Sequence, residues 1–121
     1  MYGVPVDLPL QSFVGQEFSQ ICIGSYQVQL SCPDTGSISI EGKWELRDKS
    51  GELIDVNQEH NERKSYQLHR VINVPVTGFV VDPPRSFTLF FETGLRLTVF
   101  DDSKQYESFI LYLEGGDILP V

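Results

Sequence analysis

Cationic side chains are scarce in this sequence, and its first 40 residues contain none. The 121 residues carry nine Lys and Arg against 17 Asp and Glu, so the formal net charge is −8. A nucleic-acid backbone or an anionic membrane requires a cationic surface, so this balance argues against either as the partner. The acidic surface either provides solubility alone or steers a basic partner into contact.

Metal ligands and catalytic motifs are also few. His60 and His69 are nine residues apart, which is not a helical ligand spacing, and the chain has no HExxH or Cys-rich motif. Residues 59–62 and 101–103 contain metal-binding atoms, but a surface helix and a turn explain them better. The sequence also lacks a Gly-x-Ser-x-Gly elbow, an activated-cysteine signature and a glycine-rich phosphate loop. We therefore predict a protein without catalytic activity, bound metal or cofactor.

Long apolar runs and targeting signals are absent as well. The longest uncharged apolar run is far too short to span a membrane, and the start MYGVPVDLPLQ lacks the pattern of a signal peptide. A tight turn at residues 23–26 places Cys22 opposite Gln27 and Cys32 opposite Glu17, about 17 Å apart along the ladder. A disulfide requires Cα atoms within about 7 Å, so we expect two free thiols and a cytoplasmic protein.

Residues that favour β-strands are abundant, with eight Phe and five Tyr against one Trp and one Met. The length suits a single domain over residues 1–121. Alternating apolar residues and turn signals predict an α+β fold, a mostly antiparallel meander of about seven strands. One helix, at about residues 60–71, is expected to pack on the sheet, although a loop fits the first half of this polar segment nearly as well.

The clearest strand signal is FTLFFETGLRLTVF, residues 87–100, which predicts a β-hairpin. Its loop is Glu92-Thr93-Gly94, with Gly94 in the left-handed conformation that glycine adopts at low cost. This register collects the apolar side chains on one face. The facing pairs there are Phe91 and Leu95, Leu89 and Leu97, and Phe87 and Val99.

A candidate binding cluster follows from the next predicted strand, residues 105–113. If this strand pairs with the second half of the hairpin, Phe109 lies beside Arg96, which already faces Phe90 on the outer side. Glu107 is then diagonal to Arg96. The cluster is either a cation–π ladder covered by the helix or the N-terminal arm, or an open surface that anchors a partner, because aromatic and arginine side chains dominate binding hot spots.

The order of these segments resembles small bacterial proteins of unknown function, in which a "dG.LrL.F.dG" hairpin precedes a "YESW"-like strand. The resemblance covers roughly residues 20–114 and implies no catalytic residues. In size and charge the chain is also similar to immunity proteins of bacterial toxin systems. The matching residues are Gly94, Leu95, Arg96, Leu97, Tyr106, Glu107, Ser108 and Phe109, with Phe where those relatives often carry Trp.

These observations favour a non-catalytic protein-binding module. The specific hypothesis is an immunity-type protein whose acidic surface covers a basic toxin domain, with Phe90, Arg96, Phe109 and Glu107 as candidate contacts. Two alternatives belong to other classes: a structural module that self-associates, for example as a homodimer, and a small-ligand-binding domain or enzyme with a pocket between sheet and helix.

Overall fold

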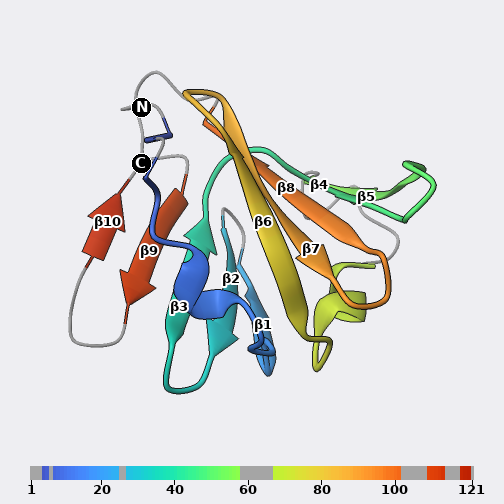
Figure 1. The fold of residues 1–121 in the computed structure, drawn as a ribbon, viewed down its shortest axis with the longest axis horizontal. Helices are drawn as coiled ribbons and strands as arrows, with labels where there is room; N and C mark the ends of the chain where they lie inside the picture. Colours follow the sequence, from blue (N-terminus) through green and yellow to red (C-terminus); the bar gives the residue numbers. More distant parts are fainter. Residues whose placement is uncertain are drawn as a thin grey trace.

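Two five-stranded antiparallel sheets pack against each other through their apolar faces (Figure 1). The computed structural model describes residues 4–5, 7–24, 27–57, 67–101, 109–113 and 118–120. Within these residues the helical elements are two short 3-10 helices, η1 (Gln11–Phe13) and η3 (Leu68–Val71). The described chain is therefore all-β, and the predicted α+β fold is wrong.

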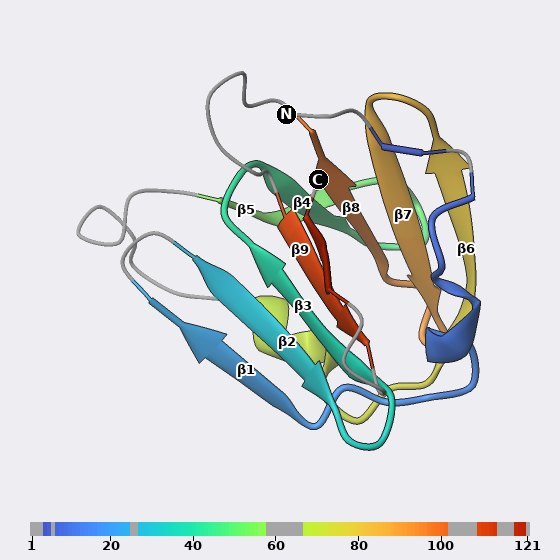
Figure 2. The ribbon, with the colours of Figure 1, turned by 90° about the vertical axis from the view of Figure 1, so that its left-hand side faces the viewer.

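The two sheets form separate layers, and the first lies in front of the second in Figure 2. The first has the strand order β1-β2-β3-β9-β10 and the second the order β5-β4-β8-β7-β6. In the first sheet the strands are β1 (Gln20–Ile23), β2 (Val28–Cys32), β3 (Gly36–Ile40), β9 (Phe109–Leu113) and β10 (Ile118–Pro120). In the second they are β4 (Trp44–Arg47), β5 (Leu53–Val56), β6 (Val76–Asp82), β7 (Ser86–Phe91) and β8 (Arg96–Phe100).

One run of alternating apolar residues supplies a strand to each sheet. Ile38 and Ile40 of β3 are buried, and the alternation continues after a short link with buried Trp44 and Leu46 of β4. The link contains Gly42. The chain leaves one sheet here and enters the other while its apolar side stays inside.

The β7–β8 hairpin has the predicted register. Leu89 pairs with Leu97, Phe87 pairs with Val99, and all four side chains are buried. Gly94 has a φ of +93°, and its N–H donates to the carbonyl of Phe91 at 2.8 Å. The loop conformation and the apolar face of the hairpin are therefore confirmed.

The predicted pairing of the segment after residue 104 with β8 is wrong. The free side of β8 is occupied by β4, whose Trp44 and Leu46 face Val99 and Leu97. The described part of the later strand, β9, belongs to the other sheet, where Phe109 pairs with Ile40. β9 thereby buries its own apolar side against the shared core.

The predicted helix at residues 60–71 is also wrong in its described part. Residues 60–66 lie outside the described residues, and η3 is a single turn of 3-10 helix whose Leu68 and Val71 are buried. The carboxylate of Asp55 accepts hydrogen bonds from the N–H groups of Gln67 and Leu68, at 2.7 and 3.0 Å. A neighbouring strand therefore caps this turn, and two buried side chains hold it without an amphipathic α-helix.

Both cysteines are free thiols, as predicted, with Cys22 exposed and Cys32 buried. The predicted register is wrong by two residues, because Cys22 pairs with Gln29. The chain reverses between Gly24 and Gln27, one residue later than predicted, and the N–H of Gly24 donates to the carbonyl of Gln27. A two-residue slip keeps each side chain on its predicted face.

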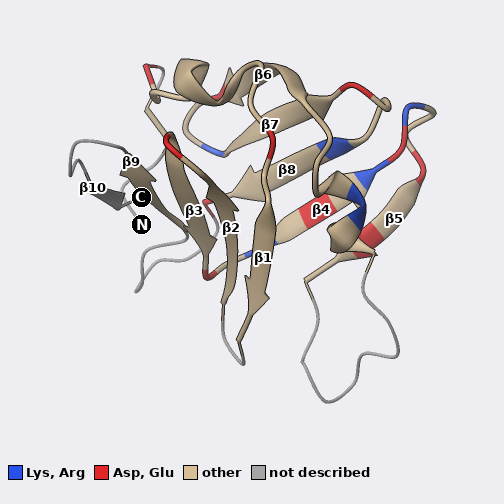
Figure 3. Cartoon of the chain, turned by 90° about the horizontal axis from the view of Figure 1, so that it is seen from below, with Lys and Arg blue, Asp and Glu red and all other residues tan. Residues whose placement is uncertain are grey.

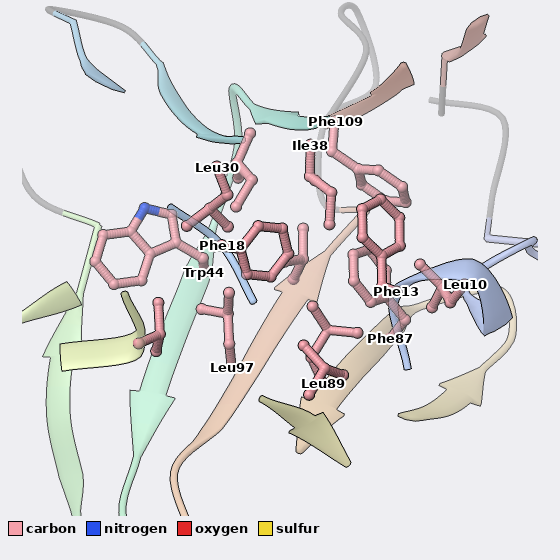
Figure 4. Close-up of a cluster of buried hydrophobic side chains, with 14 of the residues drawn as sticks. Leu10, Phe13, Phe18, Leu30, Ile38, Trp44, Phe87, Leu89, Leu97 and Phe109 are labelled. Atoms are coloured by element: carbon pink, nitrogen blue, oxygen red, sulfur yellow. The ribbon is translucent and has the colours of Figure 1, made fainter. Parts of the chain in front are cut away.

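The core lies between the sheets and is closed by the N-terminal arm (Figure 4). In this arm, which precedes β1, Leu8, Leu10 and Phe13 are buried, and Val6 lies outside the described residues. The Phe13 and Phe18 rings stack with centroids 5.7 Å apart. β6 is an edge strand with a register shift at Val76–Gly78, a position that suits the neighbouring Pro75 and Gly78.

Candidate protein-binding surface

The structure separates the residues that the sequence groups into one cluster. Phe90 and Arg96 are cross-strand partners, and the guanidinium carbon of Arg96 lies 5.8 Å from the centre of the Phe90 ring. Phe109 is instead fully buried in the core, with its ring centre 4.9 Å from that of Phe87. Glu107 lies outside the described residues. The structure therefore keeps one pair of the predicted cluster on the outer face.

The outer face of the second sheet is formed by residues that alternate with core residues along β4, β8 and β7. They lie in three rows across the strands, since the two ladders share β8. Lys43, which directly precedes β4, joins the third row because its carbonyl accepts a hydrogen bond from the N–H of Phe100. We call these residues the cationic face. The rows are Arg47, Arg96 and Phe90; Glu45, Thr98 and Thr88; and Lys43, Phe100 and Ser86.

A second cation–aromatic pair lies at the other end of this face. The Nζ of Lys43 is 4.9 Å from the centre of the Phe100 ring. The sequence prediction missed this pair because it joined β8 to the wrong strand. The sequence pattern places Lys43 and Phe100 each on the outer side of its own alternating run. Only the β4–β8 pairing brings the two side chains together.

Glu45 is the carboxylate at the centre of the face. Its side chain is 18% exposed and lies 3.8 Å from Lys43 Nζ and 3.3 Å from an Arg47 nitrogen. Arg47 is held further by a hydrogen bond to the carbonyl of Gly51 at 2.9 Å. Lys43 and Arg47 thus share one carboxylate, and Arg96 is a third cation on this face, in a chain whose net charge is −8.

Arg96 is the cation on this face whose charge is not balanced. It is exposed and lies directly opposite Arg47 in the ladder, so two cationic residues are cross-strand neighbours. Arg47 bonds to Glu45 and to the carbonyl of Gly51, whereas Arg96 packs over the Phe90 ring. Among the described residues Arg96 makes no ion pair, and the Phe90 ring is its packing partner. Like charges in this position destabilise a sheet, so the arrangement reduces stability and is not needed for folding.

The turns beside Arg96 carry acidic residues. The β4–β5 turn and the β7–β8 loop meet here, because a Cβ at Gly94 would lie 2.8 Å from the Cβ of Lys49. The first turn carries Asp48, Lys49 and Glu52, and the second loop carries Glu92, so together the two have a net negative charge. The hydroxyl of Ser50 donates to the Asp48 carboxylate, and this hydrogen bond lowers the pKa of Asp48. Basic segments of β4 and β8 therefore have acidic turns next to them (Figure 3).

Exposed aliphatic side chains border the cationic face. Val80 of β6, opposite Thr88, is 53% exposed, and Leu53 of β5, opposite Arg47, is 45% exposed. The hydroxyls of Thr88 and Thr98 are 2.9 Å apart in the middle row. Aromatic rings, arginines and exposed aliphatic groups on one flat surface are the composition typical of binding hot spots.

The outer face of the first sheet has a different character. Its residues are uncharged, and we call it the neutral face. Gln29 donates to Ser37 at 3.3 Å, and Ser39 donates to Gln27 at 3.1 Å, so its polar groups largely satisfy one another. The strand residues of the neutral face are Gln20, Cys22, Gln29, Ser31, Ser37, Ser39, Ile110 and Tyr112.

The described chain offers neither a metal-binding cluster nor a membrane-spanning helix. No group of three or more His, Cys, Asp or Glu in the described chain could hold a metal ion. His69 is exposed on η3, whereas residues 59–62, which the sequence offers as polar ligands, lie outside the described residues. Of residues 101–103 the structure describes Asp101, whose N–H donates to the carbonyl of Arg85. No described helix is long and apolar enough to cross a membrane.

Comparisons of the chain with protein-family models, with curated proteins and with solved structures gave no match. A functional assignment therefore depends on the geometry and charge of the two outer faces.

Proposed function

We propose that this chain is a non-catalytic protein-binding module that contacts its partner through the cationic face. The observation that carries the proposal is the pairing of Arg96 with Phe90 on exposed β-strands, opposite Arg47 and without an acidic partner in the described chain. An arginine above an aromatic ring is pre-organised for a contact, because less side-chain entropy is lost when it binds.

The partner can be specified further as a protein with a basic surface, as for an immunity-type protein that neutralises a toxin domain. Size, the net charge of −8 and the acidic turns beside Arg96 support this step. Asp48 and Glu92 would meet basic groups of the partner, while the aromatic rings hold the complex. Electrostatic attraction of this kind accelerates association and weakens as salt screens the charges.

The experiment is affinity capture from the lysate of the native host, with the purified protein as bait at low and moderate salt. The variants Phe90→Ala and Arg96→Gln should lose a stoichiometric protein that the unmodified bait retains. Gln29→Ala on the neutral face is the matched control and should retain it. Circular dichroism and thermal melting establish that each bait is folded. Capture that is equal for all four baits would overturn the proposal.

The proposed role as an immunity-type protein, which we call the immunity step, has its own test. The captured protein, produced alone in cells, should be toxic, and co-production of this chain should restore growth. Arg96→Gln should rescue poorly, whereas Gln29→Ala should rescue fully. A harmless captured protein, or a complex whose affinity does not change with salt, would contradict the immunity step and leave the binding module as the function.

A second candidate is self-association through β1, an edge strand of the first sheet. Its sequence, QICI, has no charge or proline to block pairing, and Ile23 is 42% exposed. Such an edge can pair with the edge of another chain. Sedimentation analysis should then show a dimer that Ile23→Lys converts to a monomer. A monomer over the whole concentration range would exclude this candidate.

A further inference from the structure

The row of Arg47, Arg96 and Phe90 on the cationic face combines two arginines with an aromatic ring. We propose that Arg47, Arg96 and Phe90 form a subsite for a single carboxylate, supplied by an Asp or Glu side chain of the protein partner and flanked there by basic residues. This inference rests on the proposed function, and it specifies which chemical group the partner presents.

The first step concerns charge. Arg47 and Arg96 are directly paired across β4 and β8, and paired residues in an antiparallel ladder have Cα atoms only about 4.5–5.5 Å apart. Glu45 neutralises Arg47 in part, at 3.3 Å, and it is shared with Lys43. An anion placed between the two guanidinium groups would replace repulsion with attraction on both sides.

The second step concerns geometry. A guanidinium group presents a planar fork of N–H donors that matches the two oxygens of a carboxylate. Glu45 and the carbonyl of Gly51 fix the Arg47 guanidinium, and the Phe90 ring supports that of Arg96. Both donors are therefore positioned before a ligand binds, which lowers the entropy that binding costs.

The third step concerns the size of the ligand. Glu45 borders the row on one side, and the turns that carry Asp48 and Glu92 border it on the other. A polyanion such as a nucleic-acid strand would place further phosphates against these carboxylates. One carboxylate with basic neighbours fits the row and the acidic turns together. The same arrangement accounts for a cationic face on a chain with net charge −8.

The test uses NMR on isotope-labelled protein, observing the Nε–H signals of the arginines. The probes are a capped peptide Lys-Gly-Glu-Gly-Lys, the same peptide with Gln in place of Glu, and inorganic phosphate. We expect the Glu peptide to shift the Arg96 and Arg47 signals. It should bind about tenfold more tightly than the Gln peptide, because the Gln amide cannot form the charge-assisted hydrogen bonds of a carboxylate. Equal binding of both peptides, or tighter binding of phosphate, would overturn the proposal.

Protein variants test the assignment to the row. Arg96→Gln should remove the difference between the two peptides, and Arg96→Lys should reduce it, because lysine keeps the charge but lacks the fork. Lys43→Gln is the matched control, since Lys43 also lies over a ring and beside Glu45 but at the opposite end of the face. Retention of the difference in Arg96→Gln would contradict the assignment.

The outcomes separate this inference from the proposed function. Loss of partner capture in Arg96→Gln and Phe90→Ala together with indistinguishable Glu and Gln peptides would overturn the carboxylate subsite alone. Selective Glu-peptide binding together with partner capture that ignores every substitution on the face would overturn the protein-binding role and also the assignment to a partner's side chain.

Discussion

The two outer faces of the sandwich solve the same physical problem in different ways. Each sheet is apolar on its inner side, so its outer face must be polar to meet water. The neutral face does so with amide and hydroxyl groups that bond to one another, such as Gln29 with Ser37. The cationic face instead places Arg96 opposite Arg47 and leaves its charge unbalanced within the described chain. Folding accounts for the first arrangement, whereas the second supplies the surface on which the proposed contact depends.

The largest predicted effect contrasts the two phenylalanines that the sequence placed together. Phe109→Ala should destabilise the fold by about 3–5 kcal/mol, because Phe109 is fully buried against Phe87. Phe90→Ala should cost only about 1 kcal/mol, since Phe90 is half-buried under one cation, yet it should abolish partner capture. Urea denaturation measures both. A similar cost for the two variants would show that the cationic face is covered in solution.

A smaller effect compares one polar contact on each face. Glu45→Gln should cost about 1 kcal/mol at low salt, because it leaves Lys43 and Arg47 without their shared carboxylate. Gln29→Ala should cost a similar amount through one lost hydrogen bond. The salt dependence separates them: the cost of Glu45→Gln should shrink towards 1 M salt, where the Debye length is about 3 Å. Equal salt dependence would contradict the electrostatic difference between the faces.

The coupling between Arg47 and Arg96 should be weaker still. In a double-mutant cycle with Arg47→Gln and Arg96→Gln, we expect a repulsive coupling free energy of about 0.5 kcal/mol at low salt. The double variant should be more stable than the sum of the single effects. An attractive coupling would mean that the unliganded protein already balances Arg96, and it would weaken the case for a carboxylate subsite.

The smallest effect lies in the acidic turn beside the cationic face. Ser50→Ala should raise the pKa of Asp48 towards its ordinary value, because the hydroxyl hydrogen bond that lowers it is removed. Since the folded-state pKa is lowered, its contribution to stability is present above the ordinary pKa and is lost as the pH falls through the folded value. Stability at neutral pH should barely change. An NMR pH titration of the Asp48 side chain measures the shift.

Half of the candidate site could be predicted from the sequence. Phe90 and Arg96 belong to one hairpin, and their pairing follows from the loop chemistry and the alternation of its two strands. Arg47, Glu45 and Lys43 were missed because they join the face through β4, which is distant in sequence from β8. Phe109 was placed on the outer face because its strand, FILYL, carries apolar residues on both sides, so its pattern indicates neither the inward side nor the neighbouring strand.

The helix prediction failed on a different physical point. Polar residues with one ion-pair spacing and a few apolar groups are compatible with a surface helix. In the structure, Leu68 and Val71 enter the core from a single 3-10 turn, and buried Asp55 of β5 accepts two of its N–H groups. The partner that satisfies this turn comes from another element, so local propensity could not reveal it.

The sequence by itself determined which sides of β7 and β8 face inward, where the β7–β8 loop turns, and that both thiols are free. These properties follow from the two-residue period of a strand and from the backbone freedom of glycine, which act over a few residues. Only the tertiary structure decided which strands are neighbours, and with them whether Phe109 enters the core or Arg96 meets Arg47. Strand pairing joins distant segments through backbone groups that are nearly the same in every residue, so it is selected by the packing of the whole core.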